Sequence, residues 1–140
     1  MTILKGTILR GMDAAHRAIA VQMQHLLPHI DLSGFYMGTI NVHLDDPLII
    51  TQFDVSTPPI KWHPNEDTDR FSFLRVGFQL DTSKFGDPVD AVIYHAAASP
   101  HRSDARFIEI MTRKLDIGHN LRCFIHVNRS SESASAIVLH

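Results

Sequence analysis

Short segments with an apolar residue at every second position fill most of this chain, and that period of two constrains the fold more than any other feature. Successive side chains of a β-strand point to opposite faces, so the period predicts strands that are buried on one side. Similar patterns predict strands at residues 3–9, 36–44, 47–53, 71–80, 106–111 and 121–127, with an optional edge strand at 137–139. Residues 89–95 are apolar on both faces, which predicts a central strand. Residues 36–44 alternate most strictly, with Ile40, Val42 and Leu44 on one face and Thr39, Asn41 and His43 on the other.

A single segment has the period of a helix instead. It follows Asp13, a suitable N-cap, and Pro28 should end it. Its apolar stripe consists of Ile19, Met23, Leu26, Leu27 and Ile30. One helix among six or more strands predicts a closed barrel or a sandwich, with the helix laid over one end of the barrel. The pattern alone does not choose between these two folds.

Composition limits the class of protein. The 140 residues are 44% hydrophobic and 20% charged, which fits one globular domain, placed at residues 1–129, and a mobile Ser-rich tail at 130–140. A formal charge of −2 favours neither nucleic acid nor an anionic membrane as a partner. The single cysteine, Cys123, allows no internal disulfide, and no apolar run reaches the roughly 18 residues that cross a bilayer. These features are typical of a cytoplasmic protein, and they leave its oligomeric state open.

The segment Tyr36-Met37-Gly38-Thr39-Ile40-Asn41 carries the strongest chemical signal. Residues two apart on a strand share a face and lie about 6.6 Å apart along its axis, so the Thr39 hydroxyl and the Asn41 amide oxygen can converge on one ion or phosphate. Both are neutral oxygen donors, which suffice for Mg²⁺ when the phosphates of a nucleotide supply the charge. The plainer alternative is that these residues form the solvent-facing side of an antiparallel strand.

This six-residue motif, placed after a helix and opening a strand, resembles the Tyr-x-Gly-Thr-Leu-Asn signature of the archaeal CTP-dependent riboflavin kinases, with Ile40 in place of leucine. Segments at 88–93, 100–104, 107–110, 114–115 and 121–127 resemble the family in order and spacing. The resemblance covers most of residues 3–128. It implies a mostly β fold, a closed six-stranded cradle-loop barrel with one N-terminal helix. It also implies transfer of the CTP γ-phosphate to riboflavin, giving FMN.

The resemblance further implies roles for individual residues. Thr39 and Asn41 match the family's Mg²⁺ ligands, and Glu109 matches the glutamate that contacts the flavin, where it could orient or deprotonate the ribityl hydroxyl. Further positions that match or lie close to the family's ligand-binding segments are Gly11, Tyr36, Gly38, His101, Arg113, Lys114 and Leu115. The ligands implied are Mg²⁺ carried by CTP, and riboflavin or FMN.

Two departures from the family pattern keep other functions open. The family cradles phosphate with a Gly-x-Gly-x-Gly loop after its first strand, whereas this chain reads Gly11-Met12-Asp13-Ala14-Ala15. His101 stands where the family has a flavin-contacting threonine. The alternatives are a non-catalytic barrel that binds a flavin or nucleotide, and a structural partner protein in which residues 36–41 serve packing.

Other residues that suggest chemistry have plainer explanations. His25 and His29 have the helical spacing of zinc ligands but lack the glutamate of the metalloprotease pattern, so they are expected at the surface or its boundary. Trp62 is expected to anchor the polar loop at 54–70, and Cys123 is expected in the core. His95 flanks the segment that corresponds to the flavin loop and is a candidate ligand contact.

Overall fold

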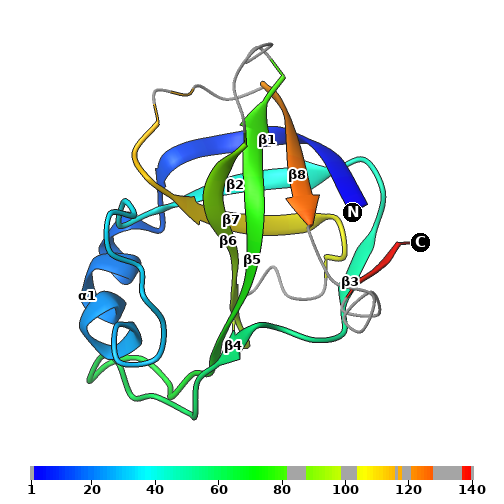
Figure 1. Ribbon diagram of the computed structural model, residues 1–140. Coiled ribbons are helices and arrows are strands. Elements are labelled where there is room, and N and C mark those ends of the chain that lie inside the picture. The colour runs from blue at the N-terminus through cyan, green and yellow to red at the C-terminus, as the bar shows by residue number, and fades with distance from the viewer. Residues whose placement is uncertain are drawn as a thin grey trace.

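The chain folds into a closed antiparallel barrel of six strands with one helix in the described residues. The computed structural model describes residues 2–81, 88–98, 104–115, 117, 121–127 and 137–139. Its elements are β1 (Thr2–Ala14), α1 (His16–Leu26), β2 (Thr39–Leu44), β3 (Leu48–Ile50), β4 (Val55–Ser56), β5 (Phe71–Leu80), β6 (Val89–Ala96), β7 (Phe107–Thr112), β8 (Arg122–Val127) and β9 (Ile137–Leu139). The ring runs β5-β6-β7-β2-β1-β8, and β8 pairs again with β5 (Figure 1). The predicted barrel is confirmed, and ring closure decides against the sandwich.

The barrel interior is filled by apolar side chains from every strand of the ring. The predicted alternation is confirmed for residues 40–44, because Ile40, Val42 and Leu44 are at most 1% exposed. The predicted strand began too early, since β2 starts at Thr39 and residues 36–38 lie outside it. Fully burying one such side chain contributes roughly 1.5–3 kcal/mol, and a slip of one residue would turn all three toward the outside. The interior therefore fixes the register that places the polar residues between them.

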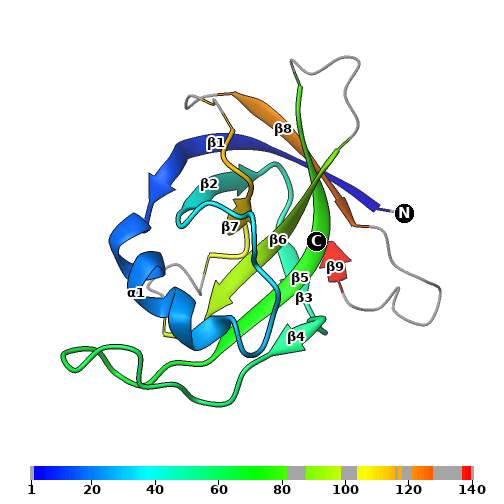
Figure 2. The same ribbon diagram turned by 60° about the vertical axis from the view of Figure 1, so that its left-hand side comes forward.

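A second apolar layer lies outside the barrel, beneath α1 (Figure 2). Its buried members are Ile19, Leu26, Ile30, Leu32, Phe71, Phe73, Val92, Tyr94, Ala96 and Met111, and we call this set the helix layer. Because α1 and its following loop cover part of β5 and β6 from outside, residues 71–74 of β5 and 91–94 of β6 are buried on both faces. This confirms the expectation of a central strand at 89–95.

The helix starts later than predicted. β1 continues to Ala14, and α1 begins at His16 after Ala15, whose φ of 55° lies in the left-handed region. No side chain caps this end of α1. The prediction of Asp13 as N-cap is therefore wrong, because pairing of β1 with β2 extends the strand through that position.

The buried stripe of α1 also differs from the predicted one. Ile19, Leu26 and Ile30 are buried as predicted, and α1 ends before Pro28. Leu27 is 48% exposed, since it lies at the C-cap and faces away from the barrel. Gln22, which the predicted stripe did not include, is only 4% exposed.

Two short pairings lie outside the ring. The 54–70 segment, predicted as a loop, contains β4, which pairs with the start of β5. β3 pairs with β9, and both views show these two strands side by side (Figures 1 and 2). The optional edge strand at 137–139 is thus confirmed, while the other residues of the predicted tail, 130–136 and 140, lie outside the described residues. Across the described residues, no helix has the length and apolar character that crossing a bilayer requires.

Candidate functional site

Three oxygen-bearing side chains meet near the start of β2. The Thr39 hydroxyl lies 3.3 Å from the Asn41 amide oxygen and 3.4 Å from a Glu109 carboxylate oxygen. We call these three residues the oxygen cluster. Thr39 is fully buried, whereas Asn41 and Glu109 are half-buried, so solvent reaches the cluster through the latter two. A purely solvent-facing role for Thr39 is therefore excluded.

Strand register explains this convergence. Asn41 on β2 is directly opposite Glu109 on β7, and their inward-pointing neighbours fill the barrel interior. Residues directly opposite on paired strands have Cβ atoms about 4.5–5.5 Å apart, which leaves the outward-pointing side chains in reach of one another. The predicted convergence of Thr39 and Asn41 is confirmed, and Glu109 joins them. His43, predicted on the same face, is exposed and lies outside the cluster.

The oxygen cluster has the donor chemistry of a site for a hard cation. A hydroxyl, an amide oxygen and a carboxylate are ligand types that Mg²⁺ accepts. The single hydroxyl proton of Thr39 can go to only one of the two neighbouring acceptors at a time. One carboxylate leaves most of the coordination to other ligands, so the cluster fits a metal that arrives with phosphate oxygens. Within the described ranges, no three His, Cys, Asp or Glu side chains gather to hold a metal.

β1 is irregular beside the oxygen cluster. Its pairing with β2 passes from Arg10 opposite Asn41 to Ala14 opposite Thr39, so residues 11–13 face Ile40 alone. Such bulges bend a strand and are frequent beside functional sites. Here the bulge brings the Met12 carbonyl oxygen so close to Gly38 that a Cβ at Gly38 would overlap it. Close packing against β1 therefore explains the glycine at position 38. Gly11 lies within the bulge.

Tyr36 lies between an imidazole and an ammonium group. The His16 ring stacks on it with centroids 5.6 Å apart and planes 22° apart, and Lys114 Nζ lies 5.3 Å from the Tyr36 centroid. The backbone N–H of Tyr36 donates to the Thr112 carbonyl oxygen, and His16 Nδ1 donates to the Met37 carbonyl oxygen. These contacts join the start of α1, the segment before β2 and the end of β7.

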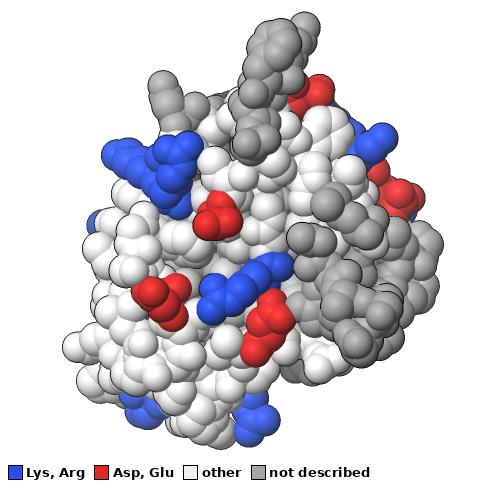
Figure 3. All heavy atoms as spheres, in the orientation of Figure 1, with Lys and Arg blue, Asp and Glu red and all other residues white. Residues whose placement is uncertain are grey.

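The predicted nucleotide contacts after β7 divide into two kinds. Arg113 and Lys114 are exposed, so their charges are accessible to an anionic ligand. Leu115 is half-buried, and its backbone N–H lies 2.8 Å from the Met12 sulfur, which gives it a packing role. On the face drawn in Figure 3, basic residues gather in one group at the upper left and elsewhere alternate with acidic residues.

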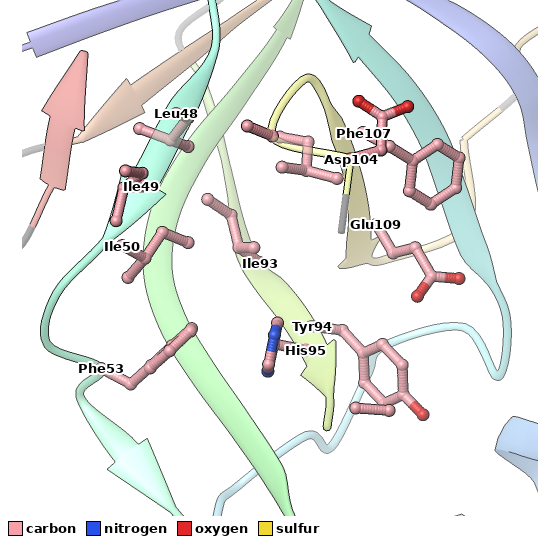
Figure 4. Close-up of a pocket in the computed structure, with 13 residues that line it drawn as sticks. Leu48, Ile49, Ile50, Phe53, Ile93, Tyr94, His95, Asp104, Phe107 and Glu109 are labelled. Carbon is pink, nitrogen blue, oxygen red and sulfur yellow. The ribbon is translucent and has the colours of Figure 1, made fainter. Parts of the chain in front are cut away.

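A cavity of about 550 Å³ opens beside Glu109 (Figure 4). Its walls come from β3 with Phe53, the end of β6, and residues 104–105 and 107–109. The lining is mostly apolar, and its polar members are Tyr94, His95, Asp104 and Glu109. Ligand pockets typically measure about 300–1,000 Å³ and combine apolar walls with a few polar groups, so this cavity has the size and lining of a small-molecule site. His95, a predicted ligand contact, lines it with its ring centroid 5.4 Å from that of Phe53.

A buried hydrogen bond connects α1 to β6, the strand that pairs with β7 at Glu109. This bond was not predicted from the sequence. Tyr94 on β6 is opposite Glu109, and its hydroxyl donates to the Gln22 side-chain oxygen at 2.7 Å. Burial, together with the charge of Glu109, raises the pKa of Tyr94 well above its usual range, so the hydroxyl keeps the proton it donates. The sequence signal was a polar residue within the apolar stripe, three residues after Ile19 and four before Leu26.

The other singled-out residues have simple environments. His101 lies outside the described residues. His25 and His29 are half-buried and exposed, as predicted. Trp62 packs against the helix layer. Cys123 lies in the barrel interior as predicted, and burial raises the pKa of its thiol to about 12, which leaves it unreactive at neutral pH.

Comparison with known proteins assigns no family to the chain. A scan against protein-family models found no match, and a search of curated proteins found no relative. The oxygen cluster and the cavity are therefore the features from which a function can be inferred.

Proposed function

We propose that this protein is a Mg²⁺-dependent phosphotransferase that moves the γ-phosphate of CTP to riboflavin, giving FMN. The observation that carries the proposal is the double position of Glu109. Its carboxylate lies 3.4 Å from the Thr39 hydroxyl, and the same residue lines the 550 Å³ cavity. Phosphorylating a hydroxyl on a ring compound needs an apolar pocket for the ring next to an oxygen-rich site for metal and phosphate. The resemblance of residues 36–41 to the riboflavin kinase motif adds the identity of donor and acceptor.

Each residue has a role in this proposal. The flavin ring occupies the cavity, and the ribityl chain extends past Glu109. Thr39 and Asn41 would hold the Mg²⁺ that arrives with CTP, and the ion would supply neutralisation of charge on the transferring phosphoryl group. The exposed Arg113 and Lys114 offset the remaining phosphate charge.

The transfer step is a simple displacement. Glu109 accepts a hydrogen bond from the ribityl 5′-hydroxyl and takes its proton. The hydroxyl oxygen forms the new bond to the γ-phosphorus, and the bond from that phosphorus to the CDP leaving group breaks. In phosphoryl transfer the protein contributes chiefly by positioning and charge stabilisation, so a cluster with one carboxylate is sufficient.

A second function, ligand binding without turnover, is favoured by the structure of β1. Residues 11–14 form part of a bulged strand. A glycine-rich phosphate loop at this position would instead turn several backbone N–H groups toward one anion. Pairing of Ala14 with Thr39 uses this segment in the sheet instead. The cavity and Glu109 would then hold a flavin or nucleotide for regulation.

One assay separates the two functions. Purified full chain is incubated with riboflavin, Mg²⁺ and either CTP or ATP, and FMN is measured by chromatography. The phosphotransferase predicts FMN with CTP, none after chelation of Mg²⁺, and none without nucleotide. Riboflavin binding with no FMN from either nucleotide would select the binding function. Neither binding nor FMN would reject both.

A further inference from the structure

The cavity wall formed by β3 is attached to the barrel in an unusual way. All three residues of β3 line the cavity. Among the described strands, β3 pairs with β9 and with no strand of the ring. The register places Leu48 opposite Leu139, Ile49 opposite Val138, and Ile50 opposite Ile137. The strand nearest the end of the sequence therefore supports a wall of the candidate ligand pocket.

Two backbone hydrogen bonds attach this segment to the rest of the chain, one at the start of β3 and one beyond its end. At the start, the Leu48 backbone N–H donates to the Ala105 carbonyl oxygen at 2.7 Å, and Ala105 also lines the cavity. Beyond β3, the Asp54 backbone N–H donates to the Phe73 carbonyl oxygen at 2.9 Å. Ile49, between these points, is 45% exposed, so burial holds it only in part. Leu48 is buried in the barrel core and Ile50 packs against it, so the ladder to β9 adds a backbone restraint mainly at Ile49.

A ladder of this kind is easily opened. Two-stranded pairings of a few residues are marginal in water without further packing, and such elements open locally at low free-energy cost. A ligand in the cavity contacts β3 from the inside, while β9 pairs with its backbone. Two partners that order the same segment favour each other's binding, and this coupling is reciprocal.

We propose that β9 is a strap on the cavity: its pairing with β3 tightens ligand binding, and ligand binding tightens the pairing. The identity of the ligand, riboflavin, rests on the proposed function. The coupling between β9 and the cavity does not, because it would hold for any ligand that contacts β3. The β3–β9 ladder thereby has a regulatory role, because anything that displaces β9 would weaken ligand binding.

Two variants at one position of β9 test the strap. Val138→Pro removes a backbone donor and disfavours the strand, whereas Val138→Thr keeps the backbone and a β-branched side chain. Riboflavin affinity is measured by quenching of its fluorescence. We expect Val138→Pro to weaken binding by about five- to tenfold, within the usual range of coupling between sites, and Val138→Thr to stay within about twofold of the unmodified chain. Replacing residues 137–139 by Gly-Ser-Gly should match the proline variant.

The outcomes are distinguishable from failure of the proposed function. Equal riboflavin affinity in all variants would overturn the strap and leave the proposed function intact. If the unmodified chain does not bind riboflavin, the proposed function fails. The same variants are then compared with anilinonaphthalene sulfonate, a dye that needs only an apolar cavity. Weaker dye binding in Val138→Pro than in Val138→Thr would support the strap, and equal dye binding would overturn it.

Discussion

The barrel interior and the helix layer are two apolar cores built on opposite faces of shared strands, and they differ in kind. Every strand of the ring contributes apolar side chains to the interior. The helix layer contains Tyr94, which hydrogen-bonds to buried Gln22 and is opposite Glu109 of the oxygen cluster. The interior thus fixes register, while the outer face accommodates the polar groups that a site needs.

The largest expected effect is in the interior. Phe78→Ala removes a side chain that is 1% exposed in the barrel core, and such substitutions cost about 3–5 kcal/mol through lost transfer energy and a cavity. Urea denaturation of the full chain measures the change in unfolding free energy. A loss below about 1 kcal/mol would mean that the interior relaxes and does not fix the register, since surface-like losses have that size.

Neighbouring leucines of α1 test the helix layer. Leu26 is fully buried and Leu27 is 48% exposed, so they form a matched pair of the same residue type. We expect Leu26→Ala to cost about 2–4 kcal/mol of unfolding free energy and Leu27→Ala less than about 0.5 kcal/mol. Thermal and urea denaturation give both values. Equal losses of unfolding free energy in the two variants would contradict the buried face assigned to α1.

The hydrogen bond between Tyr94 and Gln22 tests how much it costs to leave a buried polar group in the helix layer without its partner. Tyr94→Phe leaves the buried Gln22 oxygen without the hydroxyl donor and should cost about 1–3 kcal/mol. Adding Gln22→Leu removes the second polar group and should recover part of this loss. A double-mutant cycle of unfolding free energies measures the coupling. Strict additivity of the two changes would show that the bond contributes nothing.

The smallest expected effect is at the surface, where Arg122 donates two hydrogen bonds to the Asp45 carboxylate at 2.7 and 2.5 Å. These bonds lower the pKa of Asp45, so the pair stabilises the fold above the unfolded pKa of about 4, and this contribution is lost as pH falls through the folded value. Both side chains are 43% exposed, so Asp45→Asn should cost less than about 1 kcal/mol at pH 7. The difference from the unmodified chain should shrink below pH 4 and in high salt. A difference that grows on acidification would contradict the assignment.

The parts of the fold that depend on local pattern could be predicted from the sequence. The bounds of β5 and the inward face of β2 follow from alternation, because register and burial have the same period. The start of α1 could not be predicted in this way. Asp13 satisfies the preference for an N-cap, but pairing of β1 with β2, a long-range contact, keeps this segment extended.

The candidate site also has features that local spacing predicts and features that depend on long-range pairing. Thr39 and Asn41 share a face through their spacing alone, so their proximity was predictable. The contact between Glu109 and Thr39 depends on the register of β2 against β7, which no local pattern contains. The shape of the cavity could not be anticipated either, since it combines β3 with β6 and β7, which come much later in the sequence.

The most direct test of the account is the binding of two ligands to two variants. The central claim is that Glu109 serves both the oxygen cluster and the cavity, whereas Asn41 serves the cluster alone. Calorimetric titration should show that Glu109→Gln weakens binding of both riboflavin and Mg²⁺·CTP by about tenfold or more, the equivalent of one hydrogen bond to a charged group. Asn41→Ala should weaken Mg²⁺·CTP alone and abolish FMN formation. Unchanged affinity of Glu109→Gln for either ligand would contradict the claim.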